Sequence, residues 1–284
     1  MKKLLILCLS FLGLMASAQP KGLLWKITSP KFEKPSYLYG TIHITCDASL
    51  AEATKKALSE TEKLFLELDM DDPALQMTMM QHMRMSGGKT LKSLLSEGDF
   101  KLLDDYMKRN LGMSAVLVNT VKPFMISAMF YPKMIECPMQ SVEQELMKLS
   151  AQSQKEILGL ETVTDQLAIF DAIPYEVQLE ELIKSVKNDF VNDKAETAKL
   201  YESYATQDVE LMYKLATESQ NKLTSEYDDV LLDKRNKSWI PVIETQLQKQ
   251  PSFFAVGAAH LGGPNGVINL LRKAGYVVEV VGNQ

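Results

Sequence analysis

The sequence is poor in the residues that most often hold metals, with three histidines and three cysteines among 284 residues. No serine lies in a Gly-x-Ser-x-Gly elbow, which argues against an α/β-hydrolase nucleophile. The chain also lacks the His-Glu-x-x-His helix of common zinc proteases and the Gly-x-x-x-x-Gly-Lys-Ser/Thr loop that binds nucleotide phosphates. These absences remove the commonest local signatures of hydrolases and nucleotide-binding proteins.

Positive charge is also in deficit, because 31 Lys and Arg stand against 36 Asp and Glu, a net charge of -5. Nucleic-acid-binding proteins carry basic patches, so this balance argues against a nucleic acid partner. No apolar run after the amino terminus reaches the roughly 20 residues that a membrane-spanning helix needs. We therefore expect no stable membrane anchor in the body of the chain.

The amino terminus has the order of a secretory signal: Met1-Lys2-Lys3, an apolar run from 4 to 14, then Ala16-Ser17-Ala18. The alternative is a membrane anchor, for which this run is too short. A lipoprotein anchor would need a cysteine just after the cleavage point, but Cys8 lies inside the run. We predict a signal peptide over 1–18 and an exported protein, periplasmic or extracellular.

Two cysteines, Cys46 and Cys137, remain after such cleavage. In an oxidising compartment an isolated pair is joined more often than it is free, so we predict a disulfide. The alternative is that Cys46, three residues after His43, binds a metal. One Cys beside one His, without a second such pair in the chain, is weak evidence for a metal site, so we favour the disulfide.

The hydrophobic patterns predict an α/β fold in which both ends of the chain form one mixed sheet. The residues 19–284 then form one domain with a large helical insertion at about 73–248. Segments rich in aliphatic and aromatic residues and bounded by turn signals predict strands at 23–28, 36–40, 63–69, 156–161, 252–257 and 276–281. Helical spacing at 51–61 and 262–274 supplies the connections.

One helical stretch in the insertion is rich in methionine, at positions 77, 79, 80, 83 and 85. A binding surface or a soft metal site is one interpretation. Packing in a core is the other, and we expect it because methionine fills irregular core gaps well.

Two histidines share one context, because His43 follows an apolar segment ending in Gly40 and His260 follows one ending in Gly257. In an open sheet, ligands bind beyond the carboxyl ends of the strands, where the following loops converge. We therefore expect both Gly-x-x-His loops to face one crevice, and neutral imidazole is a common ligand of divalent metals. His82 lacks this context and is expected to be structural or on the surface.

Two carboxylates, Glu67 and Glu161, lie at comparable strand ends. A charge beside an apolar strand is costly unless it is paired or bound to a metal. One interpretation is an ion pair with Arg235 or a lysine, or exposure at the strand end. The other is a metal hydrolase, in which a carboxylate serves as a general base toward metal-bound water.

Together these residues resemble the TraB/GumN family, which is similar to the Tiki metalloproteases. The resemblance rests on Tyr37-Leu38-Tyr39-Gly40-Thr41-Ile42-His43, Gly159-Leu160-Glu161, Arg235-Asn236 with Trp239, and Val256-Gly257-Ala258-Ala259-His260. It implies a metal-dependent protease that uses manganese, cobalt or zinc and acts on a peptide or protein. It also implies that His43 and His260 match the paired family motifs and that Glu67 matches a family acidic residue.

The resulting hypothesis is an exported metallopeptidase. Metal ligands are His43, His260 and Glu67, and catalytic candidates are Glu67, Glu161 and Arg235. For Arg235 we weigh binding of a substrate carboxylate or oxyanion against a structural salt bridge. Hydrolysis of another bond, such as an ester, and sequestration of a peptide or metal without turnover are the alternatives. The sequence does not indicate an oligomeric state.

Overall fold

A computed structural model describes residues 20–282, so the proposed signal peptide lies outside the described residues. One mixed sheet of six strands has the order β4-β3-β5-β2-β1-β6. The strands are β1 (Leu24–Thr28), β2 (Ser36–Thr41), β3 (Lys63–Leu66), β4 (Glu156–Gly159), β5 (Ser252–Gly257) and β6 (Val277–Val280). The predicted α/β class and the sheet built from both ends of the chain are confirmed.

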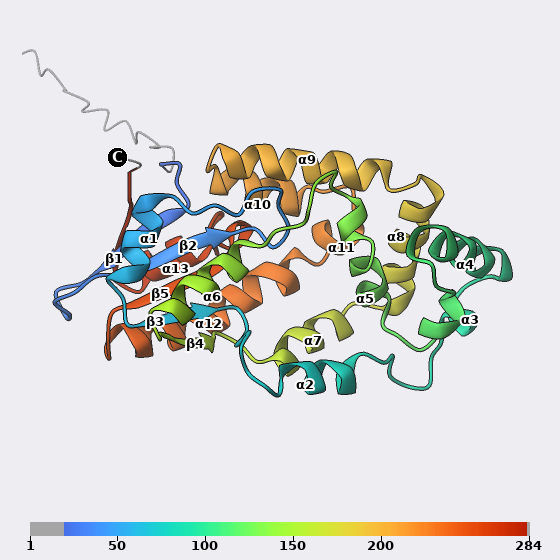
Figure 1. Cartoon of the computed structure of the whole chain (residues 1–284), viewed down its shortest axis with the longest axis horizontal. Helices are drawn as coiled ribbons and strands as arrows, with labels where there is room; N and C mark the ends of the chain where they lie inside the picture. The colour runs from blue at the N-terminus through green and yellow to red at the C-terminus, as the bar shows by residue number, and fades with distance from the viewer. Residues whose placement is uncertain (1–19, 283–284) are drawn as a thin grey trace, which may run out of the picture.

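The helices occupy the connections between strands. They are α1 (Glu52–Ser59), α2 (Leu75–His82), α3 (Leu91–Leu94), α4 (Glu97–Leu111), α5 (Pro123–Ala128), α6 (Val142–Gln152), α7 (Val163–Asp171), α8 (Tyr175–Lys187), α9 (Val191–Ala205), α10 (Val209–Thr217), α11 (Lys222–Ser225), α12 (Lys234–Leu247) and α13 (Val267–Lys273). The sheet lies at one end of the molecule with α1, α6, α12 and α13, while α3, α4, α5 and α8 lie at the other end (Figure 1). Within the described residues, no helix is long and apolar enough to cross a membrane.

Four neighbouring strands of the sheet are parallel. β5 pairs in parallel with β2 and with β3, and β3 pairs in parallel with β4. Strands β2 and β5 are central and are buried almost throughout, which explains why they are near-continuous apolar runs. The carboxyl ends of all four parallel strands therefore lie at one edge of the sheet. The segments that follow them contain His43, Glu67, Glu161 and His260.

Two separate groups of buried side chains stabilise the molecule. One surrounds the sheet and includes Trp25, Phe254 and Trp239, and the other joins helices α4, α5 and α8 through residues such as Leu103 and Phe130. Strand β4 belongs to the sheet although it lies within the range of the helical insertion.

The expectation that the methionine-rich stretch packs in a core is wrong for most of its members. Met77 and Met80 are 66% and 70% exposed, and Met79 is 36% exposed, whereas Met85 is buried. Helix α2 has no buried residue, because it lies at the surface beside α7 (Figure 1). His82, on the same helix, is exposed.

The predicted disulfide is present and joins Cys46 to Cys137, with 5.6 Å between their Cα atoms. Thr45 and Gln140 extend this connection through a pair of backbone hydrogen bonds of 3.0 and 2.9 Å. Both contacts hold the loop after His43 against the segment that leads into α6. The alternative role of Cys46 as a metal ligand is excluded by this pairing.

Replacing both cysteines with serine is expected to lower the free energy of unfolding by about 2–4 kcal/mol, because the disulfide closes a long loop. The bonded residues are 91 positions apart. Urea denaturation of the Cys46→Ser/Cys137→Ser variant measures the loss, with reduced wild-type protein as the matched control. A variant within about 0.5 kcal/mol of the oxidised wild type would contradict a stabilising role.

Candidate active site

The two Gly-x-x-His loops converge at Gly257. A Cβ atom at this glycine would lie 3.3 Å from Glu67 Oε1, 3.6 Å from His260 Cδ2 and 3.8 Å from His43 Nε2. The absence of a side chain at Gly257 therefore leaves a space that both histidines and Glu67 border. This is the arrangement that the strand ends predicted.

His43 is held by a residue that the sequence did not single out. Its Nδ1 lies 2.7 Å from Glu143 Oε1, near the start of α6, and Ser141 donates to the other oxygen of Glu143 at 2.7 Å. If Nδ1 donates to this carboxylate, Nε2 is left toward Gly257. The His43 side chain is 65% exposed, so this part of the site is open to solvent.

Charge couples His43 and Glu143. Desolvation by the surrounding protein lowers the pKa of the His43 ring, but the hydrogen bond and charge of Glu143 outweigh it and raise this pKa to about 9. Burial raises the pKa of Glu143, and the hydrogen bond and charge of His43 outweigh burial and lower it to about 2. The pair is thus ionised at neutral pH when no metal is bound.

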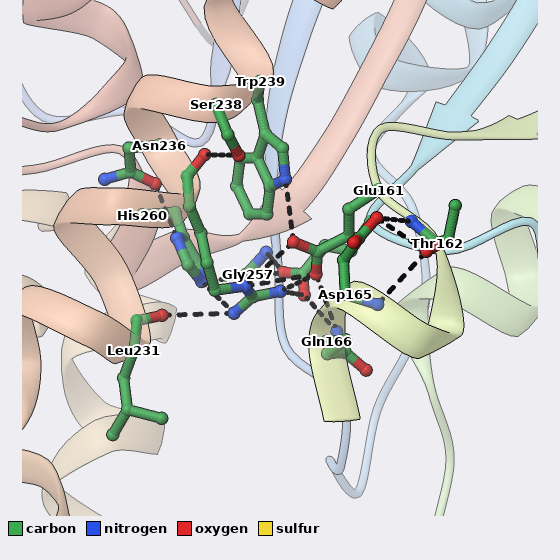
Figure 2. Close-up of polar contacts among 12 residues, drawn as sticks. Glu161, Thr162, Asp165, Gln166, Leu231, Asn236, Ser238, Trp239, Gly257 and His260 are labelled. Atoms are coloured by element: carbon green, nitrogen blue, oxygen red, sulfur yellow. Dashed lines mark hydrogen bonds and ion pairs between the residues drawn. The ribbon is translucent and has the colours of Figure 1, made fainter. Parts of the chain in front are cut away.

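His260 is buried and held by Asn236, on α12. Asn236 Nδ2 donates to the carbonyl of Asn265 at 3.0 Å, so its Oδ1 faces His260 Nδ1 at 2.6 Å. Figure 2 shows this contact beside Trp239, whose ring centre lies 4.7 Å from that of His260. Burial is the main cause of the lowered pKa of His260, about 3, and nearby Arg235 and His43 lower it further. The ring is therefore neutral, with the Nδ1 proton donated to Asn236.

Arg235 occupies the centre of the ionic network. Its Nη2 donates to Glu67 Oε2 and to Glu161 Oε1, each at 2.6 Å, and its Nε donates to Glu161 at 3.1 Å. Its Nη1 donates to the carbonyl of Leu231 at 3.2 Å and lies 3.0 Å from His260 Nε2. All five N–H donors of a guanidinium are thereby engaged, which corresponds to the salt-bridge interpretation of Arg235.

Glu67 and Glu161 differ in what they face. Glu67 accepts the backbone N–H of Gly257 at 2.8 Å and lines a groove with His43 and Glu143. Burial alone would raise the pKa of Glu67, but the charge of Arg235, together with that of His43 and the backbone hydrogen bond from Gly257, holds it well below its usual range. Glu161 instead borders a different hollow with Arg235 and accepts from the indole of Trp239 at 3.1 Å (Figure 2).

The donor types fit a divalent transition metal. Two imidazoles have Nδ1 held by outer partners, and one carboxylate lies beside them, as in many metal sites. Across residues 20–282, however, no group of three His, Cys, Asp or Glu side chains is arranged so that it could hold a metal ion. In addition, the contact between Arg235 Nη1 and His260 Nε2 uses the lone pair that a metal would require.

Sequence reasoning identified His43, His260, Glu67, Glu161 and Arg235, and the structure brings all five into one region. It missed Glu143, which lies 100 positions from His43 in a helical segment with no local signal. Asn236 and Trp239 were named only as part of the family resemblance, and the sequence assigned no role to either. Gln166, which donates to Glu161 at 3.1 Å, was also missed.

The TraB/PrgY/gumN family model matches residues 23–280. Among curated proteins, the chain is 24% identical to Metalloprotease TIKI2 and 22% identical to Metalloprotease TIKI1, both from Danio rerio. Each match covers 90% of this chain, and the chain spans 60% and 62% of the lengths of these two relatives. No solved structure matches the chain significantly.

Proposed function

Because the chain belongs to the TraB/PrgY/gumN family, we propose that it is an exported hydrolase that cleaves peptide bonds with a divalent metal ion. The observation that carries this proposal is the convergence of His43, His260 and Glu67 around Gly257. The names of the two relatives support a peptide or protein substrate. The Cys46–Cys137 disulfide supports export, because disulfides persist in oxidising compartments.

His43, His260 and Glu67 would hold the ion, which we expect to be manganese, cobalt or zinc. When bound, such an ion supplies a Lewis acid for the peptide carbonyl and lowers the pKa of bound water. The contact of Arg235 with His260 Nε2 has to open before that nitrogen can act as a ligand.

The surrounding residues orient these groups. Glu143 and Asn236 fix the two imidazoles through Nδ1, which leaves Nε2 of each ring as the nitrogen that would bind a metal. Glu67 borders the open groove, so we assign it, rather than Glu161, the role of proton acceptor. Glu161 positions Arg235, since they are joined by several hydrogen bonds.

A second candidate function is binding of a peptide without turnover. The observation that favours it is that Arg235 contacts both His260 Nε2 and Glu67. His43 Nε2 is then the more accessible of the two imidazole nitrogens proposed as metal ligands.

Mass spectrometry of a peptide library incubated with the mature chain separates the two functions. We expect cleavage when manganese, cobalt or zinc is added and none after chelation. Parallel ester substrates report whether another bond is hydrolysed instead. Peptide binding without cleavage under every metal condition would favour the second candidate.

Replacing Asn236 with alanine is expected to weaken metal binding by about 10–100-fold, because partners in the outer shell orient the ligand ring. Isothermal titration with each metal measures this change, and circular dichroism checks that the variant is folded. Ser238→Ala is the matched control, since Ser238 is an exposed neighbour on the same helix. Equal affinities in the two variants would remove Asn236 from the site.

A further inference from the structure

The groove beside the candidate site has apolar walls that contain exposed methionines. Its volume is 380 Å³. Met70, Met79 and Met139 contribute to the lining and are 40%, 36% and 53% exposed. Leu66, Leu68, Leu75 and Ala255 complete the apolar part. A mostly apolar lining with a few polar groups is typical of a ligand pocket.

The groove is continuous with the groups proposed for chemistry, because His43, Glu67 and Glu143 belong to the same lining. A substrate bond placed beside His43 and Glu67 therefore brings the neighbouring part of the substrate into contact with the methionines. The volume of the groove is within the range of about 300–1,000 Å³ that is typical of ligand pockets.

The polar part of the lining selects among possible occupants. Gln140, Ser141, Gln144 and Gln166 offer neutral groups that suit a peptide backbone. The charged members are the carboxylates of Glu67 and Glu143 and the ring of His43, which Glu143 already pairs with. Among the residues that the structure describes, no lysine or arginine lines this groove. An acidic side chain is therefore disfavoured there, whereas a large apolar side chain would cover the methionines. Methionine is flexible enough to pack against several such shapes.

We propose that this methionine groove binds a large aliphatic or aromatic side chain of the substrate next to the scissile peptide bond. The inference rests on the proposed peptidase function and adds the preference of that site. It also gives a role to Met79, which is exposed despite the expectation that it would be buried.

Peptides that differ at one position, with leucine, serine or aspartate beside the cleaved bond, test the preference. We expect kcat/KM for the leucine peptide to exceed that for the aspartate peptide by more than about 10-fold, because a single methylene in an apolar pocket already changes kcat/KM by about 10–200-fold. Met79→Gln and Met139→Gln should reduce this ratio mainly through KM. Met80→Gln is the matched control, because Met80 is 70% exposed and does not line the groove.

A binding measurement separates failure of this inference from failure of the proposed function. Fluorescence anisotropy of the same peptides with the Glu67→Gln protein should show tighter binding of the leucine peptide, and Met79→Gln should weaken it. If the peptides are cleaved but kcat/KM and affinity do not depend on the varied residue, the groove assignment is wrong and the peptidase function is still supported. Preferential binding of the leucine peptide without cleavage by the wild type would support the groove and overturn the peptidase function. Absence of both binding and cleavage would overturn both.

Discussion

Replacing Arg235 with alanine is expected to lower the free energy of unfolding by about 3–5 kcal/mol, the cost of leaving a buried ionic partner uncompensated. Arg235 bonds to both Glu67 and Glu161, and the three side chains are 11%, 10% and 5% exposed. Its removal leaves two carboxylates close together in a region of low dielectric. The loss is larger than that of a surface ion pair, which contributes about 0–1 kcal/mol.

Urea denaturation of metal-free protein measures the Arg235 effect. Arg84→Ala is the matched control, because Arg84 is exposed and a surface change of this kind shifts stability by about 0.5 kcal/mol or less. Arg235→Lys should fall between the two, since it keeps the charge but loses the planar fork of donors. A stability of Arg235→Ala equal to that of the control would mean that the network does not stabilise the fold.

Replacing Glu67 with glutamine is expected to reduce the rate of peptide hydrolysis by about 10²–10⁴-fold, the usual contribution of a general acid or base. Glutamine has nearly the same shape, so the change isolates the negative charge. Arg235 keeps Glu161 as its partner, which limits the effect on folding. Steady-state kinetics with the best library peptide gives kcat and KM separately.

The chain offers a control beside the same strand. Glu62 precedes β3 and is exposed, whereas Glu67 directly follows β3 at the opposite end. Glu62→Gln should leave hydrolysis unchanged. Hydrolysis by Glu67→Gln within about threefold of this control would remove Glu67 from the chemistry and return attention to Glu161.

The parts of the site that the sequence predicted are those encoded by local patterns. Apolar segments ending at Gly40 and Gly257 identify β2 and β5, and the rule for parallel strands then places both following loops at one edge. β2 and β5 are in fact direct neighbours in the sheet. The carboxylates after β3 and β4 followed from the same reasoning.

The contacts that orient the site were not predictable in this way. Glu143 reaches His43 because the Cys46–Cys137 disulfide and the Thr45–Gln140 bridge bring two distant segments together. The pairing of the cysteines was predicted, but the position of a side chain six residues beyond Cys137 was not. Such a contact depends on how α6 packs against the sheet, which a single sequence does not encode locally.

The methionines of α2 show a second limit. Composition favours a buried position for methionine, yet exposure is decided by whether another element covers the helix. Helix α2 has a neighbour in α7, but no element within residues 20–282 covers Met77 and Met80. The interpretation as a binding surface, set aside at first, is the one that suits Met79 in the groove.

Metal binding by histidine variants tests the central claim most directly. Isothermal titration of the mature protein with manganese, cobalt and zinc should give one site per chain, and His43→Ala and His260→Ala should each abolish it or weaken it severely. His82→Ala, the third histidine of the described chain and exposed on α2, should bind like the wild type. Unchanged metal binding in both His43→Ala and His260→Ala would contradict a site assembled from the two Gly-x-x-His loops.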